Sequence, residues 1–107
     1  MSAIVTINVR SRSLFPFGQI VATPGALGAC TRDQLTGFLL AHGRGNWGIV
    51  SFDDWKQNDA AIDNGSRIFS AYPIDATKPC KGYGENCLWI ITEADRSATT
   101  FLLPDEY

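Results

Sequence analysis

Two apolar, β-prone runs between residues 88 and 103 flank a short turn that carries a carboxylate, a guanidinium and a hydroxyl, those of Asp95, Arg96 and Ser97. A guanidinium can bind carboxylates or phosphates in a bidentate geometry. Such runs around a turn are typical of a β-hairpin, so we expect these groups at its tip. Asp and Ser also hydrogen-bond their own backbone in turns, so simple turn chemistry is the alternative interpretation.

The segment at residues 42–48 places three glycines around a histidine, an arginine and a tryptophan. One interpretation is a binding loop in which His42 acts as acid or base and Arg44 contacts an anion. The other is a turn after a helix, with Trp47 in the core and Arg44 on the surface. We favour the second, because glycine is the commonest residue at the end of a helix.

Further polar residues fall at positions where a strand or helix would present them inward or across a sheet. Asn58 shares a helix face with apolar neighbours, and we expect its amide to tether a nearby backbone segment rather than to catalyse. Arg67 and Glu93 lie on strand faces that would allow an ion pair across the sheet. Tyr72 is expected in a hydroxyl-lined strip with Ser70 and Thr92.

The chain contains no nucleophile elbow, P-loop, dinucleotide fingerprint or metalloprotease helix, and it has a single histidine. The cysteines Cys30, Cys80 and Cys87 are expected as free thiols, although a disulfide between Cys80 and Cys87 is geometrically conceivable. A zinc site made from these cysteines and His42 would lack the short Cys-x-x-Cys spacing of such sites. We therefore expect no catalytic set, no metal and no cofactor.

Length and composition indicate one ordinary globular domain over residues 1–107, of which 1–17 are a possible N-terminal strand extension. The chain is 45% hydrophobic and has a formal net charge of −2, with its basic residues scattered. Scattered basic residues make nucleic acid unlikely as a general ligand. Neither a membrane span nor a signal peptide is apparent, so we expect a cytoplasmic protein without a membrane partner.

Hydrophobic periodicity and capping signals predict the order of elements. We expect strands at residues 3–10, 19–23, 66–74 and in the 88–103 hairpin, and helices beginning near Thr31 and Ser51. Gly43 is expected as the left-handed residue that ends the first helix. The predicted fold is α+β, with two helices packed on one face of a mainly antiparallel sheet and a C-terminal three-strand meander.

Several segments together resemble a family of small bacterial and mobile-element proteins, some of which are labelled as type I restriction subunits. These segments are residues 42–48, Asn58, Gly65-Ser66-Arg67, Ser70-Ala71-Tyr72, residues 88–97 and residues 103–107. The resemblance spans about residues 19–107. Residues 1–17 and 77–87 look like additions. No methyltransferase Asp/Asn-Pro-Pro-aromatic motif is present, so the restriction label does not describe an activity of this chain.

Two functions follow as hypotheses. The first is a non-catalytic protein-binding module, an accessory or anti-defence protein of mobile DNA with an unknown protein partner, because an acidic surface can block a basic nucleic-acid channel. The second is a RelE-type RNA-cleaving enzyme with His42, Arg67, Tyr72 and Arg96 as its reactive groups, which the acidic charge disfavours. An exposed edge at residues 66–74, or at the first strand, could support a homodimer.

Overall fold

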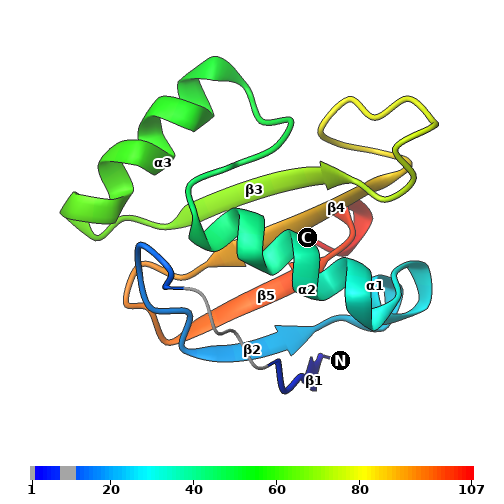
Figure 1. The fold of residues 1–107 in the computed structure, drawn as a ribbon, viewed down its shortest axis with the longest axis horizontal. Helices are drawn as coiled ribbons and strands as arrows, with labels where there is room; N and C mark the ends of the chain where they lie inside the picture. Colours follow the sequence, from blue (N-terminus) through cyan, green and yellow to red (C-terminus); the bar gives the residue numbers. More distant parts are fainter. Residues whose placement is uncertain (1, 8–11) are drawn as a thin grey trace.

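The computed structural model describes residues 2–7 and 12–107, and within them the chain forms an α+β fold built on one five-stranded sheet (Figure 1). The elements are, in chain order, β1 (Ala3–Ile4), β2 (Gln19–Ala22), α1 (Pro24–Ala29), α2 (Arg32–Gly43), α3 (Phe52–Asn64), β3 (Ile68–Pro73), β4 (Cys87–Thr92), β5 (Ala98–Leu102) and the short 3-10 helix η1 (Pro104–Glu106). The predicted fold class is confirmed. The first strand is shorter than predicted, and part of its predicted range, residues 8–10, lies outside the described residues.

The strands lie in the order β1-β2-β5-β4-β3. β3, β4 and β5 form the predicted antiparallel meander, while β2 pairs in parallel with β5. Because side chains alternate between the two faces of a sheet, this register divides the strands cleanly. Ser70, Ile90, Phe101 and Ala22 lie opposite one another in the register and are all buried on one face.

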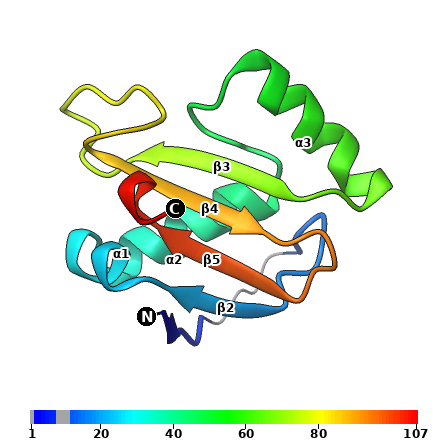
Figure 2. The same cartoon turned by 180° about the vertical axis from the view of Figure 1, so that it is seen from behind.

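That face is covered by α2, which crosses the sheet in Figure 1. Leu35 and Leu39 of α2 join Leu88, Ile90 and Phe101 of the strands in the main hydrophobic core. Figure 2 shows the opposite face, where no long helix crosses the strands. α3 lies instead beside β3 (Figures 1 and 2). The sheet therefore has one closed face and one open face.

Local capping chemistry explains where the helices begin and end. Thr31 forms the predicted capping box with Gln34, and Ser51 caps α3. α3 ends at Gly65 in the left-handed conformation. The prediction of this conformation for Gly43 is wrong: Gly43 lies within α2, and the positive φ, 82°, belongs to Gly45.

The short helix α1 was not predicted, because its Pro-Gly start looked like the end of a strand. Thr23 caps it by accepting a hydrogen bond from the Ala26 N–H, and Pro24 occupies the first turn. The carboxylate of Glu106 accepts hydrogen bonds from the Gly25 N–H at 3.0 Å and from the Thr23 hydroxyl at 2.5 Å. A residue from the other end of the described chain thus completes the start of this helix.

The outer edge of β3 is closed by side-chain and backbone hydrogen bonds. The carboxamide of Asn58 accepts from the Phe69 N–H at 3.0 Å and donates to the Phe69 carbonyl at 2.6 Å. Two residues on, Ala71 donates to the Trp47 carbonyl and accepts from the Ile49 N–H. The expectation that Asn58 tethers a backbone segment is confirmed. The expectation of an exposed edge at residues 66–74 is wrong, because these groups already use its donors and acceptors.

Gly48 is required for this close approach. Its φ is +76°, and a Cβ there would lie 1.9 Å from the carbonyl oxygen of Ala71. Only glycine adopts this conformation without strain and leaves space for the neighbouring strand.

We predict that Asn58→Ala lowers the free energy of unfolding by about 2–3 kcal/mol, because it leaves the N–H and carbonyl of Phe69 unpaired at a half-buried site. Urea denaturation monitored by circular dichroism measures the change. Gln57→Ala, one residue away on an exposed position, is the matched control and should change stability by less than about 0.5 kcal/mol. Equal stabilities of the two variants would contradict the tethering role.

Candidate functional site

His42 lies in the core and not in a binding loop. Its side chain is fully buried, and the rings of Phe15 and Trp47 contact it edge-on at centroid distances of 5.2 and 5.8 Å. Nδ1 lies 2.5 Å from the Ser70 hydroxyl, and Nε2 lies 2.9 Å from the Thr92 hydroxyl. The predicted hydroxyl strip therefore exists in part, and it serves this imidazole.

The hydrogen bonds beyond Thr92 determine which group is donor and which is acceptor throughout this hydrogen-bond network. Thr99 donates to the Phe17 carbonyl at 2.7 Å, so its oxygen accepts from Thr92, 2.8 Å away. Thr92 has then used its only proton and must accept from Nε2–H of His42. Nδ1 is consequently the acceptor for Ser70. The neutral tautomer of His42 with its proton on Nε2 is thus compatible with the hydrogen bonds of Ser70, Thr92 and Thr99.

Burial, and after it the positive charge of Arg96, lower the pKa of His42 to about 3. A neutral ring with both nitrogens engaged cannot exchange protons with a bound substrate. The interpretation of His42 as an acid or base is therefore wrong, and the favoured alternative is confirmed: Trp47 is fully buried and Arg44 is exposed. The Trp47 indole donates to the carboxylate of Asp59 at 2.9 Å.

The turn residues Asp95, Arg96 and Ser97 also have structural roles. Asp95 accepts from the Ser97 N–H at 2.9 Å, which is the expected turn chemistry. Arg96 donates to the carbonyls of Ser66 at 2.7 Å and Ala61 at 2.8 Å. Because these carbonyls lie at the end of α3, the guanidinium also meets the negative end of the helix dipole. Arg96 therefore fastens α3 to the hairpin.

The four residues expected for RNA cleavage do not converge on one site. His42 is buried on the side of α2 that faces the sheet. Tyr72 is buried as well, stacked on Phe38 at 5.1 Å, and its phenol donates to the Asn46 carbonyl. Burial raises the pKa of Tyr72. Arg96 is engaged as described, and Arg67 lies on the open face of the sheet.

The predicted ion pair between Arg67 and Glu93 is not formed. The register continues to these two residues, but both lie just beyond the ends of their strands. Arg67 donates instead to the Tyr107 phenol at 2.6 Å, and its guanidinium lies over the Tyr107 ring at 5.6 Å. A surface ion pair contributes little in water, whereas this contact combines a hydrogen bond with a cation-π interaction.

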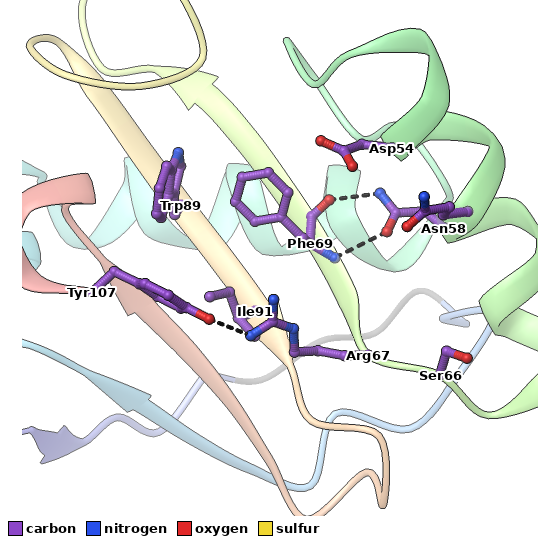
Figure 3. A pocket seen from close by; sticks show the side chains of 9 residues that line it. Asp54, Asn58, Ser66, Arg67, Phe69, Trp89, Ile91 and Tyr107 are labelled. Atoms are coloured by element: carbon purple, nitrogen blue, oxygen red, sulfur yellow. Dashed lines mark hydrogen bonds between the residues drawn. The ribbon is translucent and has the colours of Figure 1, made fainter.

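Arg67 and Tyr107 belong to a pocket of about 470 Å³ on the open face, which we call the sheet-face pocket (Figure 3). It is lined by Asp54, Gln57, Asn58, Ser66, Arg67, Phe69, Trp89, Ile91 and Tyr107. Its volume falls in the range of about 300–1,000 Å³ that is usual for ligand sites.

Aromatic rings line the sheet-face pocket. Phe69 and Trp89 meet at a centroid distance of 5.0 Å and an angle of 89°. Trp89 meets Tyr107 at 5.8 Å and 74°. The Trp89 indole donates to the Gly82 carbonyl, which fixes its ring. Because Phe69 and Trp89 are only half-buried and Tyr107 is 70% exposed, these rings offer apolar surface to a ligand.

Polar groups of both charge signs surround the rings. Within residues 2–7 and 12–107, the Asp54 carboxylate, the Gln57 carboxamide and the Ser66 hydroxyl have no hydrogen-bonding partner. Arg67 uses one N–H for Tyr107 and keeps its other donors for a ligand. In Figure 3, Asp54 and Arg67 lie on opposite sides of Phe69.

A second cavity of about 460 Å³ shares Asp54, Phe69 and Trp89 with the first and extends to Ile49, Lys81 and Tyr83. We call the two adjoining cavities together the sheet-face groove. Arg67 lines the first cavity, Lys81 lines the second, and Asp54 lines both. Ile49 is 36% and Tyr83 62% exposed, so apolar surface continues along its length.

Of the residues that line the sheet-face pocket, sequence reasoning selected Asn58 and Arg67 as candidates and missed the aromatic residues. The strand alternation did contain a signal, because it places Phe69 with Arg67 and Trp89 with Ile91 on common faces. The contribution of Tyr107 had no local signal, since its partners lie far away in the chain.

The three cysteines are free thiols, as expected. Burial raises the pKa of Cys30 to about 11, and burial together with the Cys80 thiol raises the pKa of Cys87 to about 12. Among the described residues, no three His, Cys, Asp or Glu side chains gather where a metal could bind. The zinc set considered above fails in particular at His42, whose nitrogens are both engaged.

Comparisons with protein-family models, with curated proteins and with solved structures found no match to this chain. The family resemblance therefore stays a prediction. In the part of the chain that the structure describes, no helix has the length and apolar character needed to cross a membrane.

We predict that stability falls as the pH drops below 6.5, the unperturbed pKa of His42. Below this pH the imidazole binds a proton in the unfolded chain but not in the native protein. The unfolding free energy therefore decreases as the pH falls, and the slope approaches about 1.4 kcal/mol per pH unit. Carboxylates with lowered pKa, such as Asp75 and Glu106, begin to contribute only near their lower reference values of 3.8 and 4.5. Urea denaturation between pH 7 and pH 5 isolates the histidine, and His42→Gln should remove the slope. A flat wild-type profile would be inconsistent with a buried neutral ring.

We predict that iodoacetamide alkylates Cys80 before the other cysteines in the native protein. Cys80 is half-exposed, whereas Cys30 and Cys87 are buried and their raised pKa values suppress the reactive thiolate. Peptide mapping by mass spectrometry gives the order, and denatured protein provides the control in which all three react. Early modification of Cys87 would overturn this assignment.

Proposed function

We propose that the protein is a non-catalytic protein-binding module that binds its partner in the sheet-face groove. The observation that carries the proposal is the open sheet face itself. Half-buried aromatic rings and polar groups without intramolecular partners lie together there, on a surface that no long helix crosses (Figures 2 and 3). Binding hot spots are enriched in Trp, Tyr and Arg, and the groove contains Trp89, Tyr107 and Arg67.

The placement of the reactive side chains supports binding rather than catalysis. His42 and Tyr72 are buried and engaged in internal hydrogen bonds, and Arg96 donates to backbone carbonyls. Asp54 and Gln57, in contrast, line the groove and keep polar groups available for a ligand. A binding surface needs such groups, because a partner can form hydrogen bonds with them.

The more specific parts of the hypothesis stay predictions. These are an accessory or anti-defence role in mobile DNA, a cytoplasmic location and a possible homodimer. A protein partner that is met through the groove is compatible with each of them.

We predict that tagged wild-type protein captures a stoichiometric partner from a lysate of its native host, and that Arg67→Ala/Tyr107→Ala reduces the captured amount at least tenfold. Removing these two side chains removes the cation and one aromatic wall of the sheet-face pocket, while both are surface groups. Quantitative mass spectrometry measures the capture, and circular dichroism verifies that the variant is folded.

Phe52→Ala/Lys56→Ala is the matched control. It removes another exposed aromatic ring and the cation that lies over it, 5.2 Å from the ring centroid, and neither residue lines the groove. Capture should be unchanged in this variant. Equal loss in both variants, or capture that survives both, would count against binding in the groove.

A further inference from the structure

We infer that the sheet-face groove recognises an extended peptide segment in which a carboxylate side chain neighbours a large apolar or aromatic side chain. The inference rests on the proposed function and adds the chemistry of the partner. Its basis is the juxtaposition of an oriented guanidinium, an aromatic floor and a facing carboxylate in one pocket.

Arg67 is placed to bind a carboxylate that comes from another molecule. Its Nη1 donates to Tyr107, and the Tyr107 ring lies against the guanidinium, so the side chain is already oriented. Among the described residues, no carboxylate forms an ion pair with Arg67. A guanidinium held in this way loses little entropy when its remaining N–H groups bind a carboxylate.

The aromatic floor selects the neighbouring residue. Phe69 and Trp89 meet almost at right angles and are half-buried, so they present both a ring face and a ring edge to the sheet-face pocket. An aromatic side chain can stack against one ring and contact the edge of the other, which is the preferred geometry for such contacts. Burial of a large side chain in a pocket of this kind contributes most of the affinity of a short peptide.

Asp54 supplies the opposite polarity. Its carboxylate is half-buried and unpaired within the described residues, and it lies across Phe69 from Arg67 (Figure 3). It can accept hydrogen bonds from peptide N–H groups that follow the apolar residue. Because Asp54 and Arg67 lie on opposite sides of the floor, the charges also set the direction in which the segment lies.

The closed edge of β3 restricts the mode of binding. Asn58 already uses the outward N–H and carbonyl of Phe69, and the Trp47 carbonyl and Ile49 N–H use those of Ala71. A partner therefore cannot add a strand at this edge and must contact side chains on the sheet face. A single-stranded nucleic acid would also find aromatic rings there, and the test below includes it as a competing ligand.

The test is a selection of random heptapeptides displayed on phage, performed with the immobilised full chain and with Arg67→Glu. We expect the wild type to enrich Asp or Glu next to Trp, Phe, Tyr or Leu. Arg67→Glu should replace the acidic preference by Lys or Arg, and the peptides selected on the wild type should bind it at least tenfold more weakly. Arg67→Gln should lose the preference without reversing it.

Lys56→Glu introduces the same change of charge on α3 outside the groove and should leave the selected peptides unchanged. An acidic preference that persists in Arg67→Glu would overturn the inference. So would a selection that enriches no motif. Displacement of the selected peptides by oligodeoxythymidylate at low micromolar concentration would overturn it as well. If a partner is captured through the groove but no acidic and apolar motif is enriched, the inference fails while the proposed function stands.

Discussion

The neutral imidazole of His42 is the constraint on which the rest of the structure depends. It joins α2 to β3 through Ser70 and to β4 through Thr92, and the chain of hydroxyls continues to Thr99 of β5. Each of these groups is fully buried, so an unmade hydrogen bond there would be costly. Only one arrangement of protons satisfies all of them. This network fixes where α2 lies and closes one face of the sheet.

Other polar side chains form hydrogen bonds with backbone N–H and carbonyl groups at strand edges and helix ends. Asn58 satisfies the edge of β3, Arg96 satisfies carbonyls at the end of α3, and Glu106 completes the start of α1. Within the described residues, no buried side-chain nitrogen or oxygen lacks a partner. The groups that resemble catalytic residues are thus used to hold the fold. Asp54, Gln57 and Ser66 keep free polar groups beside the half-buried aromatic rings of the open face, and this combination is the physical basis for proposing binding there.

Sequence reasoning succeeded where the signal was local. The caps at Thr31 and Ser51, the meander and the inward position of Asn58 all follow from neighbours within a few residues. It failed where the partner is distant: His42 meets Ser70 and Thr92 28 and 50 positions away, and the Glu106 carboxylate meets Gly25 81 positions away. The expected pair of Arg67 with Glu93 had the right register, but the C-terminal Tyr107 lies closer to the guanidinium. Sequence spacing cannot rank such competing partners, because their proximity is a property of the assembled fold.

The most direct test of this account is the protonation state of His42, the single histidine of the chain. Long-range proton-nitrogen NMR correlation of the imidazole between pH 5 and pH 8 distinguishes the two neutral tautomers and the imidazolium. The account predicts a proton on Nε2, none on Nδ1, and no titration across this range. An imidazolium signal at pH 5, or a proton on Nδ1, would contradict the hydrogen-bond chain and the buried, neutral state of His42 on which the account depends.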